Sequence, residues 1–171
     1  MNKIIRSFDP VASSNATVVV LGSMPGEQSL AATQYYAHPR NAFWMIMQQI
    51  VGIDAGAAYQ ERLASLRERG IALWDVLHSC HRQGSLDSAI RRGSGEVNDF
   101  NTFFSNHPAI ETVLFNGATS KRYYERYVLP DLIRIPRNHL QMPSTSPAHA
   151  AMPLAQKVAA WRTGLNFARD A

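Results

Sequence analysis

The chain of 171 residues is poor in cysteine, in lysine and in long hydrophobic runs. Its one cysteine, Cys80, has no second thiol for an intrachain disulfide, so we expect a reducing, cytoplasmic setting. No apolar stretch approaches the roughly 20 residues that a membrane-spanning helix needs. The first residues also lack the apolar core of a secretion signal. We therefore expect no membrane partner.

Several common catalytic and cofactor-binding motifs are also absent. The sequence holds no GxxxxGK[ST] phosphate loop and no GxSxG nucleophile turn, and Gly22-x-x-x-Gly26 lacks the full dinucleotide pattern. His78, Cys80 and His81 resemble metal ligands, but a four-ligand site needs a second cluster. We interpret this trio as structural, and Cys80 as a small buried residue rather than a nucleophile. No metal or organic cofactor is expected.

Cationic side chains outnumber acidic ones by 17 to 13, and the lysines are only Lys3, Lys121 and Lys157. Arginine, which supplies the rest, binds phosphate groups in a bidentate manner. The charge therefore slightly favours a nucleic-acid partner. A solvated basic surface also accounts for a net charge of +4, so charge alone leaves both interpretations open.

Apolar runs and turn residues predict alternating strands and helices. We expect strands at 17–21, 71–76, 111–115 and 139–142, with 133–135 as an alternative for the last. We expect helices at 42–51, 57–69, 97–106, 118–127 and from 148 or 153 to 167. A short edge strand at 4–8 and a polar loop at 77–96, with one helical turn near 85–91, complete the chain. This order predicts a single α/β domain over residues 1–171, with helices on both faces of a mainly parallel sheet.

Four polar loops follow the expected strands: GSMPG at 22–26, HSCHRQGS at 78–85, NGATS at 116–120 and PSTSPAHA at 143–150. The carboxyl ends of parallel strands meet at one edge of a sheet, where open α/β folds bind their ligands. We therefore expect these loops to converge on one site. The first loop and the aromatic segment 35–41 that follows it are its centre.

These loops carry the groups that a flipped-out base requires. Such a site needs an aromatic face for stacking, an amide that reads the base edge, and donors for phosphate groups. Tyr35 or Tyr36 can supply the ring, Asn41 the amide, and the backbone N–H groups of 22–26 the donors. Chemistry alone still favours simpler explanations, namely a core aromatic for Tyr36 and a helix N-cap for Asn41.

Four motifs together resemble the uracil-DNA glycosylase superfamily. They are GSMPG at 22–26, Tyr36-Ala-His-Pro-Arg-Asn41-x-Phe-Trp44, DVxxSC at 75–80 and STSPA at 144–148. The pattern is nearest to hypoxanthine-DNA glycosylases and the related mismatch-specific (G:T/U) glycosylases, and it spans residues 17 to about 150. The resemblance implies a three-layer α/β/α sandwich with a central four-stranded parallel sheet. It also implies a DNA repair enzyme without a cofactor that hydrolyses the N-glycosidic bond of a deaminated base flipped out of DNA, hypoxanthine first and uracil second.

The resemblance also implies roles for individual residues. Tyr36 matches the aromatic side chain that stacks on the base, and Asn41 matches the catalytic amide. Ser23 stands where mismatch-specific enzymes have a catalytic asparagine, between Gly22 and Met24, whose backbone N–H groups would face the base. The segment matching the part that grips the DNA backbone comprises Ser144, Thr145, Ser146 and Pro147.

Three further residues have open assignments. His149 lies just beyond the closing motif, where Met142 occupies the position of a histidine in the uracil enzymes. Asn116 either reads the base edge or forms an Asn-Gly turn. Arg82 either lines the pocket or contacts DNA phosphate groups.

The opening loop has no acidic residue to orient a water molecule. This absence favours an alternative function, a non-catalytic module that binds a damaged base or a nucleotide on the same fold. The intact motif from Tyr36 to Trp44 favours the enzyme. A monomer acting on DNA is the simplest expectation.

Overall fold

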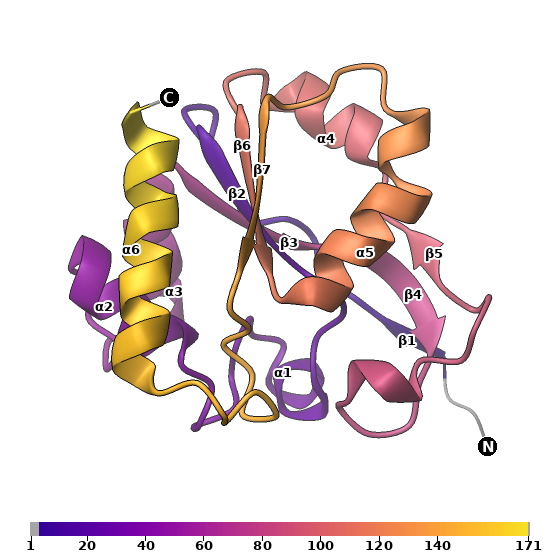
Figure 1. Cartoon of the computed structure of the whole chain (residues 1–171), viewed down its shortest axis with the longest axis horizontal. Coiled ribbons are helices and arrows are strands. Elements are labelled where there is room, and N and C mark those ends of the chain that lie inside the picture. The colour runs from indigo at the N-terminus through magenta and orange to yellow at the C-terminus, as the bar shows by residue number, and fades with distance from the viewer. Residues whose placement is uncertain (1–3, 171) are drawn as a thin grey trace.

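The computed structural model describes residues 4–170, so residues 1–3 of the expected lead-in and Ala171 lie outside it. Four parallel strands form the central sheet in the order β3-β2-β6-β7 (Figure 1). They are β2 (Val18–Gly22), β3 (Ile71–Asp75), β6 (Thr112–Asn116) and β7 (Asn138–Met142). This arrangement confirms the expected parallel sheet and selects 139–142 over 133–135 as the last strand. Ile133 and Ile135 are exposed in the connection before β7.

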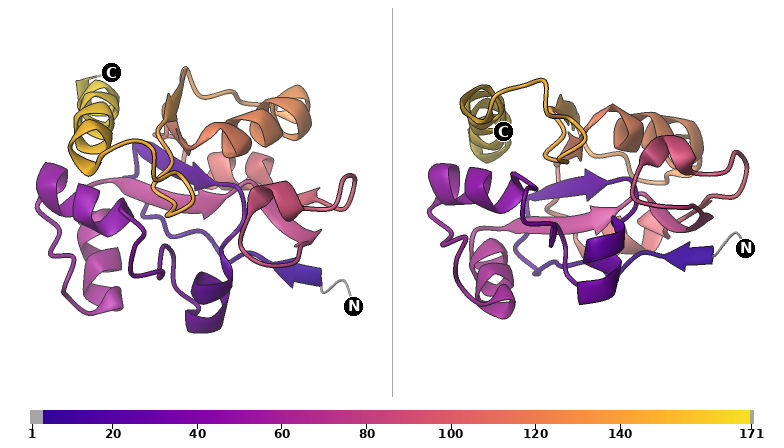
Figure 2. Two further views of the ribbon diagram at one scale, coloured as in Figure 1. Left: turned by 60° about the horizontal axis from the view of Figure 1, so that its bottom comes forward. Right: turned by 90° about the horizontal axis from the view of Figure 1, so that it is seen from below.

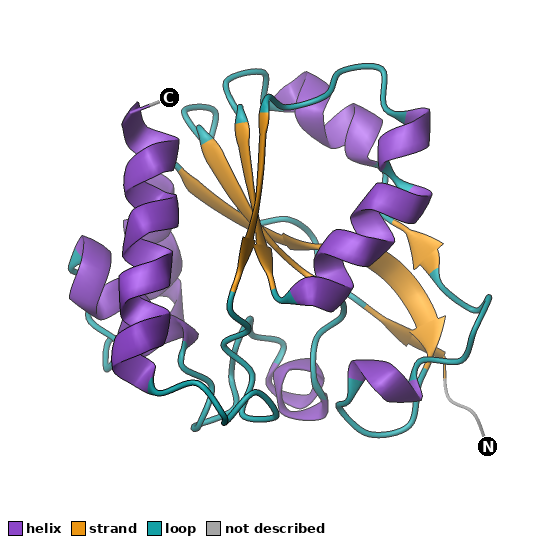
Figure 3. Cartoon of the chain, in the orientation of Figure 1, coloured by secondary structure: helices purple, strands orange, loops and turns teal. Residues whose placement is uncertain are grey.

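Helices cover both faces of the sheet (Figure 3). One side holds α2 (Phe43–Val51), α3 (Tyr59–Glu68) and α6 (Leu154–Asp170); the other holds α4 (Phe100–Asn106) and α5 (Ala118–Tyr127). Strand β2 is buried along its whole length because its alternate side chains serve both layers. Val18 and Val20 pack in the core under α2, α3 and α6, whereas Val19 and Leu21 pack in the core under α4 and α5. The three-layer α/β/α fold is confirmed.

A second, antiparallel sheet has the order β1-β4-β5 and continues beyond β3. It consists of β1 (Ile4–Arg6), β4 (Leu77–His81) and β5 (Glu96–Val97). The edge strand expected at 4–8 is thus present, but it pairs with β4 instead of the main sheet. The prediction that 77–96 is a loop was wrong at both ends, because pairing with the distant β1 stabilises the polar LHSCH segment as a strand.

Three short helical elements complete the chain: α1 (Glu27–Ala32), η1 (Asp87–Ala89) and η2 (Leu129–Asp131). Helix α1 lies in the opening loop, where no helix was expected, and η1 matches the single turn expected near 85–91. The remaining helices begin and end within a few residues of their predicted bounds, and α5 matches them at both ends.

Candidate active site

A cleft of about 780 Å³ opens at the carboxyl ends of the central strands. Figure 2 shows the loops that follow β2, β6 and β7 gathered at this edge, beside α1 and the η1 segment. The cleft brings together most of the predicted site residues: Gly22, Ser23, Met24, Tyr36, Asn41, Asn116, Ser144, Thr145, Ser146, Pro147 and His149. Three of the four expected loops therefore converge on one site, whereas the loop at 78–85 contributes only Ser85, and the role of each residue in the cleft remains a proposal.

The opening loop is fixed to the neighbouring strands by its backbone. The carbonyl groups of Gly22 and Ser23 accept hydrogen bonds from the N–H groups of Val76 and Leu77, at 2.8 and 3.1 Å. A Cβ atom at Gly22 would overlap the carboxyl group of Asp75. Glycine at this position therefore leaves room for the Asp75 carboxyl group at the floor of the cleft.

The aromatic ring of Tyr36 has one face covered by another side chain. Its ring stacks on Phe43, with centroids 4.1 Å apart and 26° between the planes. The backbone of Tyr36 has φ = 57°, in the left-handed region that non-glycine residues seldom adopt. Its side chain is half-buried and lines the cleft, while its hydroxyl oxygen is fully buried. Burial, followed by the nearby Asp75 carboxyl, raises the pKa of Tyr36, so the phenol stays neutral at physiological pH.

Asn41 begins the turn into α2 and also faces the cleft. Its Oδ1 accepts a hydrogen bond from the N–H of Phe43 at 3.0 Å, and its own N–H donates to the carbonyl of His38 at 2.8 Å. The N-cap of α2 is Ala42, so the N-cap role considered for Asn41 is not observed, and Asn41 instead stabilises the turn one position earlier. Its amide NH₂ group forms no hydrogen bond with any of residues 4–170. Asn41 can therefore hold the turn before α2 with its oxygen and offer its NH₂ group to a ligand.

Asn116 joins the end of β6 to the closing loop. Its Nδ2 donates to Thr145 Oγ1, and its Oδ1 accepts from the Thr145 N–H, both at 2.9 Å. The Thr145 carbonyl in turn accepts from the N–H of Ala42, just before α2, at 3.0 Å. Thr145 is only 1% exposed. Its burial assigns it to the scaffold of the closing loop rather than to the DNA contact predicted from the sequence.

The rest of the closing loop remains accessible. Ser144, Ser146 and Pro147 are partly exposed, and His149 is exposed. Helix α6 holds both ends of this segment: Trp161 Nε1 donates to the Pro143 carbonyl at 2.9 Å, and Lys157 Nζ donates to the His149 carbonyl at 2.8 Å. These contacts present the loop at the rim of the cleft.

Arg82 differs from its predicted role. It does not line the cleft, and its side chain is only 4% exposed. Its guanidinium donates to the carbonyls of Pro25 and Gly84, and more weakly to that of Met24 at 3.5 Å. A group buried in this way cannot reach DNA phosphate groups. Arg82 instead fixes the opening loop to the segment that follows β4.

Two acidic residues of the cleft were missed by the sequence analysis. Asp75, at the end of β3, is 4% exposed, and its carboxyl forms no hydrogen bond within residues 4–170. Burial first, and then the charge of Asp87, raise the pKa of Asp75 to about 8, although Arg82 opposes the shift. The sequence did contain a signal for Asp75, because a lone acid ending a buried apolar strand is unusual.

Asp87, in η1, accepts hydrogen bonds from Ser23 Oγ at both of its carboxyl oxygens, at 2.7 and 2.8 Å. Burial raises its pKa, opposed by the Ser23 hydroxyl, Arg82 and Arg122. Nothing in its own polar neighbourhood indicated a role for Asp87, because its contact with Ser23 joins residues 64 positions apart.

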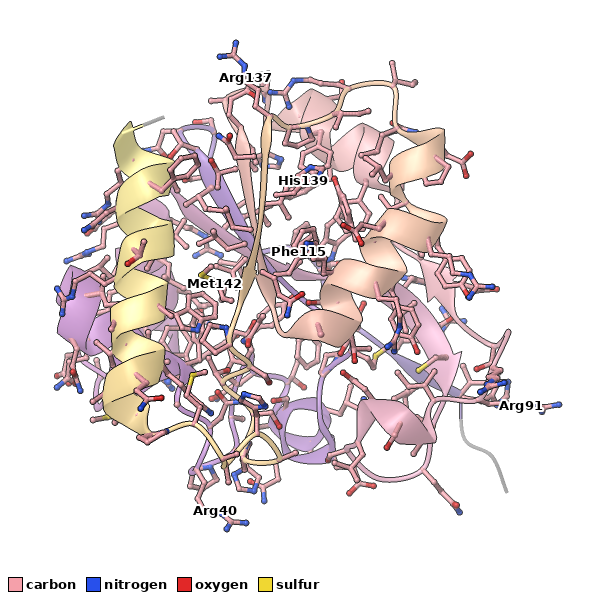
Figure 4. The ribbon with its side chains drawn as sticks, viewed as in Figure 1. Arg40, Arg91, Phe115, Arg137, His139 and Met142 are labelled. Atoms are coloured by element: carbon pink, nitrogen blue, oxygen red, sulfur yellow. The ribbon has the colours of Figure 1, made fainter. Side chains whose placement is uncertain are left out.

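Two arginine side chains lie at opposite ends of the molecule. Figure 4 shows Arg40 projecting outward beside the closing loop, at the cleft end of the molecule, whereas Arg137 projects from the opposite end. Among residues 4–170 no group of three potential metal-binding side chains occurs, so the trio around Cys80 forms no metal cluster there. None of the helices in this range is both long and apolar enough to cross a membrane.

Comparisons with known proteins agree with this geometry. Residues 9–163 match the family model of the uracil DNA glycosylase superfamily. A hypoxanthine DNA glycosylase of Methanosarcina barkeri is 39% identical over 119 residues, which cover 69% of this chain and 74% of that protein. A hypoxanthine DNA glycosylase of Methanosarcina acetivorans is 35% identical over 136 residues, which cover 74% and 85% of the two chains.

A solution NMR structure of a candidate uracil DNA glycosylase from Methanosarcina acetivorans has the same fold. It superimposes with a TM-score of 0.76 at 28% identity, over 94% of this chain and 98% of that one. The family match covers nearly the whole chain, including every loop of the cleft. The chain therefore belongs to the uracil DNA glycosylase superfamily.

Proposed function

We propose that this protein is a DNA repair glycosylase that hydrolyses the N-glycosidic bond of a deaminated base flipped out of DNA, with hypoxanthine as the preferred base. The two relatives named hypoxanthine DNA glycosylase support the choice of base. The observation that carries the proposal is the meeting, in one cleft, of the Tyr36 ring and the Asn41 amide. These are the groups that stacking on a flipped base and hydrogen bonding to its edge require.

Each residue has a role that follows from its contacts. Tyr36 stacks on the base with the ring face that Phe43 leaves uncovered. The free NH₂ group of Asn41 donates to the base, where negative charge develops as the bond breaks. Backbone N–H groups of 22–26 assist it, while Asn116 holds the closing loop in register with β6. Ser144, Ser146, Pro147 and His149 contact the DNA backbone at the rim.

Cleavage of this bond needs water but no redox or electrophilic cofactor, and the proposal therefore includes none. We also propose that the protein acts as a single-domain monomer in the cytoplasm. The lone thiol at Cys80 is buried and free, which suits a reducing compartment. Light scattering of the purified protein with and without duplex DNA tests the monomer.

The role of Asn41 is tested by abasic-site formation with two variants. Asn41→Ala removes both the hydrogen bond to the Phe43 N–H and the donor, whereas Asn41→Asp keeps an oxygen for that N–H and replaces the donor with a charged oxygen. We expect both variants to cleave a hypoxanthine duplex about 10²–10³-fold more slowly than the wild type. Asn41→Asp should keep the wild-type melting temperature.

Asn106→Ala, an exposed asparagine at the end of α4, is the matched control and should cleave at the wild-type rate. Full activity in Asn41→Asp would show that the NH₂ group is not used. Cleavage rates of uracil and G·T duplexes, measured in parallel, show which base the enzyme prefers.

A further inference from the structure

The segment between β4 and β5 forms an arm over the opening loop. We define the arm as residues 82–90, because an antiparallel bridge pairs Arg82 with Ile90 at its base. Its tip docks through two side chains: Ser85 Oγ accepts from the Glu27 N–H at 2.9 Å, and Asp87 accepts from Ser23 Oγ. The buried guanidinium of Arg82 fixes the base of the arm to the same loop. The arm is thus held at three points, and its tip lies at the cleft.

This docking brings a carboxyl group to the place where the opening loop lacks one. Ser23 follows directly after β2, is 8% exposed and lines the cleft together with Asp87. Its hydroxyl lies 2.7 and 2.8 Å from the two carboxyl oxygens of Asp87. Asp87 is half-buried, so it keeps some access to solvent. Neither the opening loop nor the aromatic segment contributes an acidic side chain to the cleft.

Asn41 and Asp75, two other polar residues of the cleft, are less suited to receive a proton from water. The Asn41 oxygen is already bonded to the Phe43 N–H. The Asp75 carboxyl is 4% exposed beneath Gly22, and burial favours its neutral form. Burial raises the pKa of Asp87 as well, but Asp87 also faces the Ser23 hydroxyl from the opening loop, Arg82 from its own arm and Arg122 from α5, all of which favour the carboxylate. Asp75 from β3, Cys80 from β4 and Tyr123 from α5 also face Asp87, whose charge raises the pKa of each of them.

We propose that Asp87 is the catalytic carboxylate that holds the attacking water, and that Ser23 is the positioning residue that orients it. This role rests on the proposed glycosylase function. The water oxygen forms a bond to C1′ of the sugar and gives a proton to Asp87. The C1′–N bond breaks and its electron pair leaves with the base, which is then protonated from Asp87 or from solvent. The products are the free base and an abasic site, and Asp87 returns to its carboxylate form.

Single-turnover cleavage of a hypoxanthine duplex, measured beside duplex affinity, tests Asp87. We expect Asp87→Ala and Asp87→Asn to cleave about 10²–10⁴-fold more slowly while binding the duplex at least as tightly as the wild type. Sodium formate should restore part of the rate in Asp87→Ala, because it supplies a small carboxylate to the vacated space. Asp131→Asn, an exposed aspartate in η2 outside the cleft, is the matched control and should match the wild type.

The positioning role of Ser23 is tested by the pH dependence of the same rate. The rate should rise with pH as Asp87 loses its proton. Since the Ser23 hydroxyl lowers the pKa of Asp87, Ser23→Ala should move this rise to higher pH. Ser23→Thr keeps a hydroxyl and should restore the wild-type profile. A lowered rate with an unmoved profile would make Ser23 merely structural.

The outcomes separate this inference from the function on which it rests. A wild-type protein that cleaves no duplex overturns the proposed function and the role of Asp87 with it. A wild type that cleaves, together with an Asp87→Ala variant within about threefold of its rate, overturns the inference alone. So does a rate that falls in step with duplex affinity, or one that formate does not restore.

Discussion

Asp75 shows how a single buried group can couple folding to pH. Its carboxyl ends the apolar strand β3, packs against Gly22 and has no hydrogen-bond partner within the described chain. Burial of a carboxyl without a partner disfavours its charged form, which is why its pKa rises to about 8 in the folded protein. An unfolded chain would release this proton near pH 4. The folded state therefore binds one more proton than the unfolded state between these values.

This difference predicts the pH dependence of stability. As pH rises from about 4 to about 8, the wild type should lose stability relative to Asp75→Asn, which cannot ionise. The melting temperatures of the two proteins should be most alike near pH 4, and the variant should be higher by pH 8, with a gap of a few kcal/mol in unfolding free energy at most. Melting curves at pH 5, 7 and 9 test this. A gap that does not change with pH would contradict the assignment, and Asp131→Asn should show no gap.

At the scale of elements, the site depends on hydrogen bonds between segments that are far apart in the chain. The pair of bonds between Asn116 and Thr145 spans 29 positions, and it ties the end of β6 to the closing loop. Thr145 is buried, so a lost partner would leave its N–H without a hydrogen bond. Such a group costs about 1–3 kcal/mol when it stays unsatisfied.

We therefore expect Asn116→Ala to lower the free energy of unfolding by about 1–3 kcal/mol. Urea unfolding of the variant and the wild type measures this, with an unchanged slope if only stability has changed. Asn106→Ala, whose side chain is exposed, should leave the midpoint in place. An unmoved midpoint in Asn116→Ala would mean that the closing loop is held mainly by its contacts with α6.

The elements that sequence could predict are those whose signals are local. The apolar runs around Val18–Gly22 and Ile71–Asp75 and the amphipathic Ala118–Tyr127 segment each contain enough information to be located. Strand β4 does not, because its LHSCH segment becomes a strand only by pairing with β1. The same reason hid Asp87, whose position depends on the docking of the arm. Tyr36 and Asn41 were predicted as site residues only because they belong to a family motif, since their residue types alone fit a core aromatic and a helix cap equally well.

At the scale of the whole molecule, the positions of the cleft and of Arg40 predict that DNA binds at one end. The chain carries a net charge of +4, and Arg40 projects beside the closing loop while Arg137 lies at the far end (Figure 4). Arg137 is also within 3.7 Å of Glu111, which partly balances its charge. Duplex binding at the cleft should therefore use Arg40 and not Arg137.

We expect the affinity for a duplex to fall steeply between 50 and 200 mM salt, as ion release requires. Arg40→Ala should weaken binding several-fold. It should also reduce the slope of log affinity against log salt concentration by about 1, the amount expected for one lost phosphate contact. Arg137→Ala, the matched control, should do neither. Fluorescence anisotropy across a salt series measures both effects. An affinity that does not change with salt would contradict binding of the DNA phosphate groups at the cleft end.

The most direct test of the central claim is abasic-site formation by the wild-type protein. Labelled duplexes that carry one hypoxanthine, one uracil or one G·T mismatch are incubated with the enzyme and then treated with alkali. We predict strand cleavage at hypoxanthine, with slower cleavage at the other two bases. Tight, salt-sensitive binding without cleavage of any duplex would contradict the account, and would leave a module that recognises a damaged base without removing it.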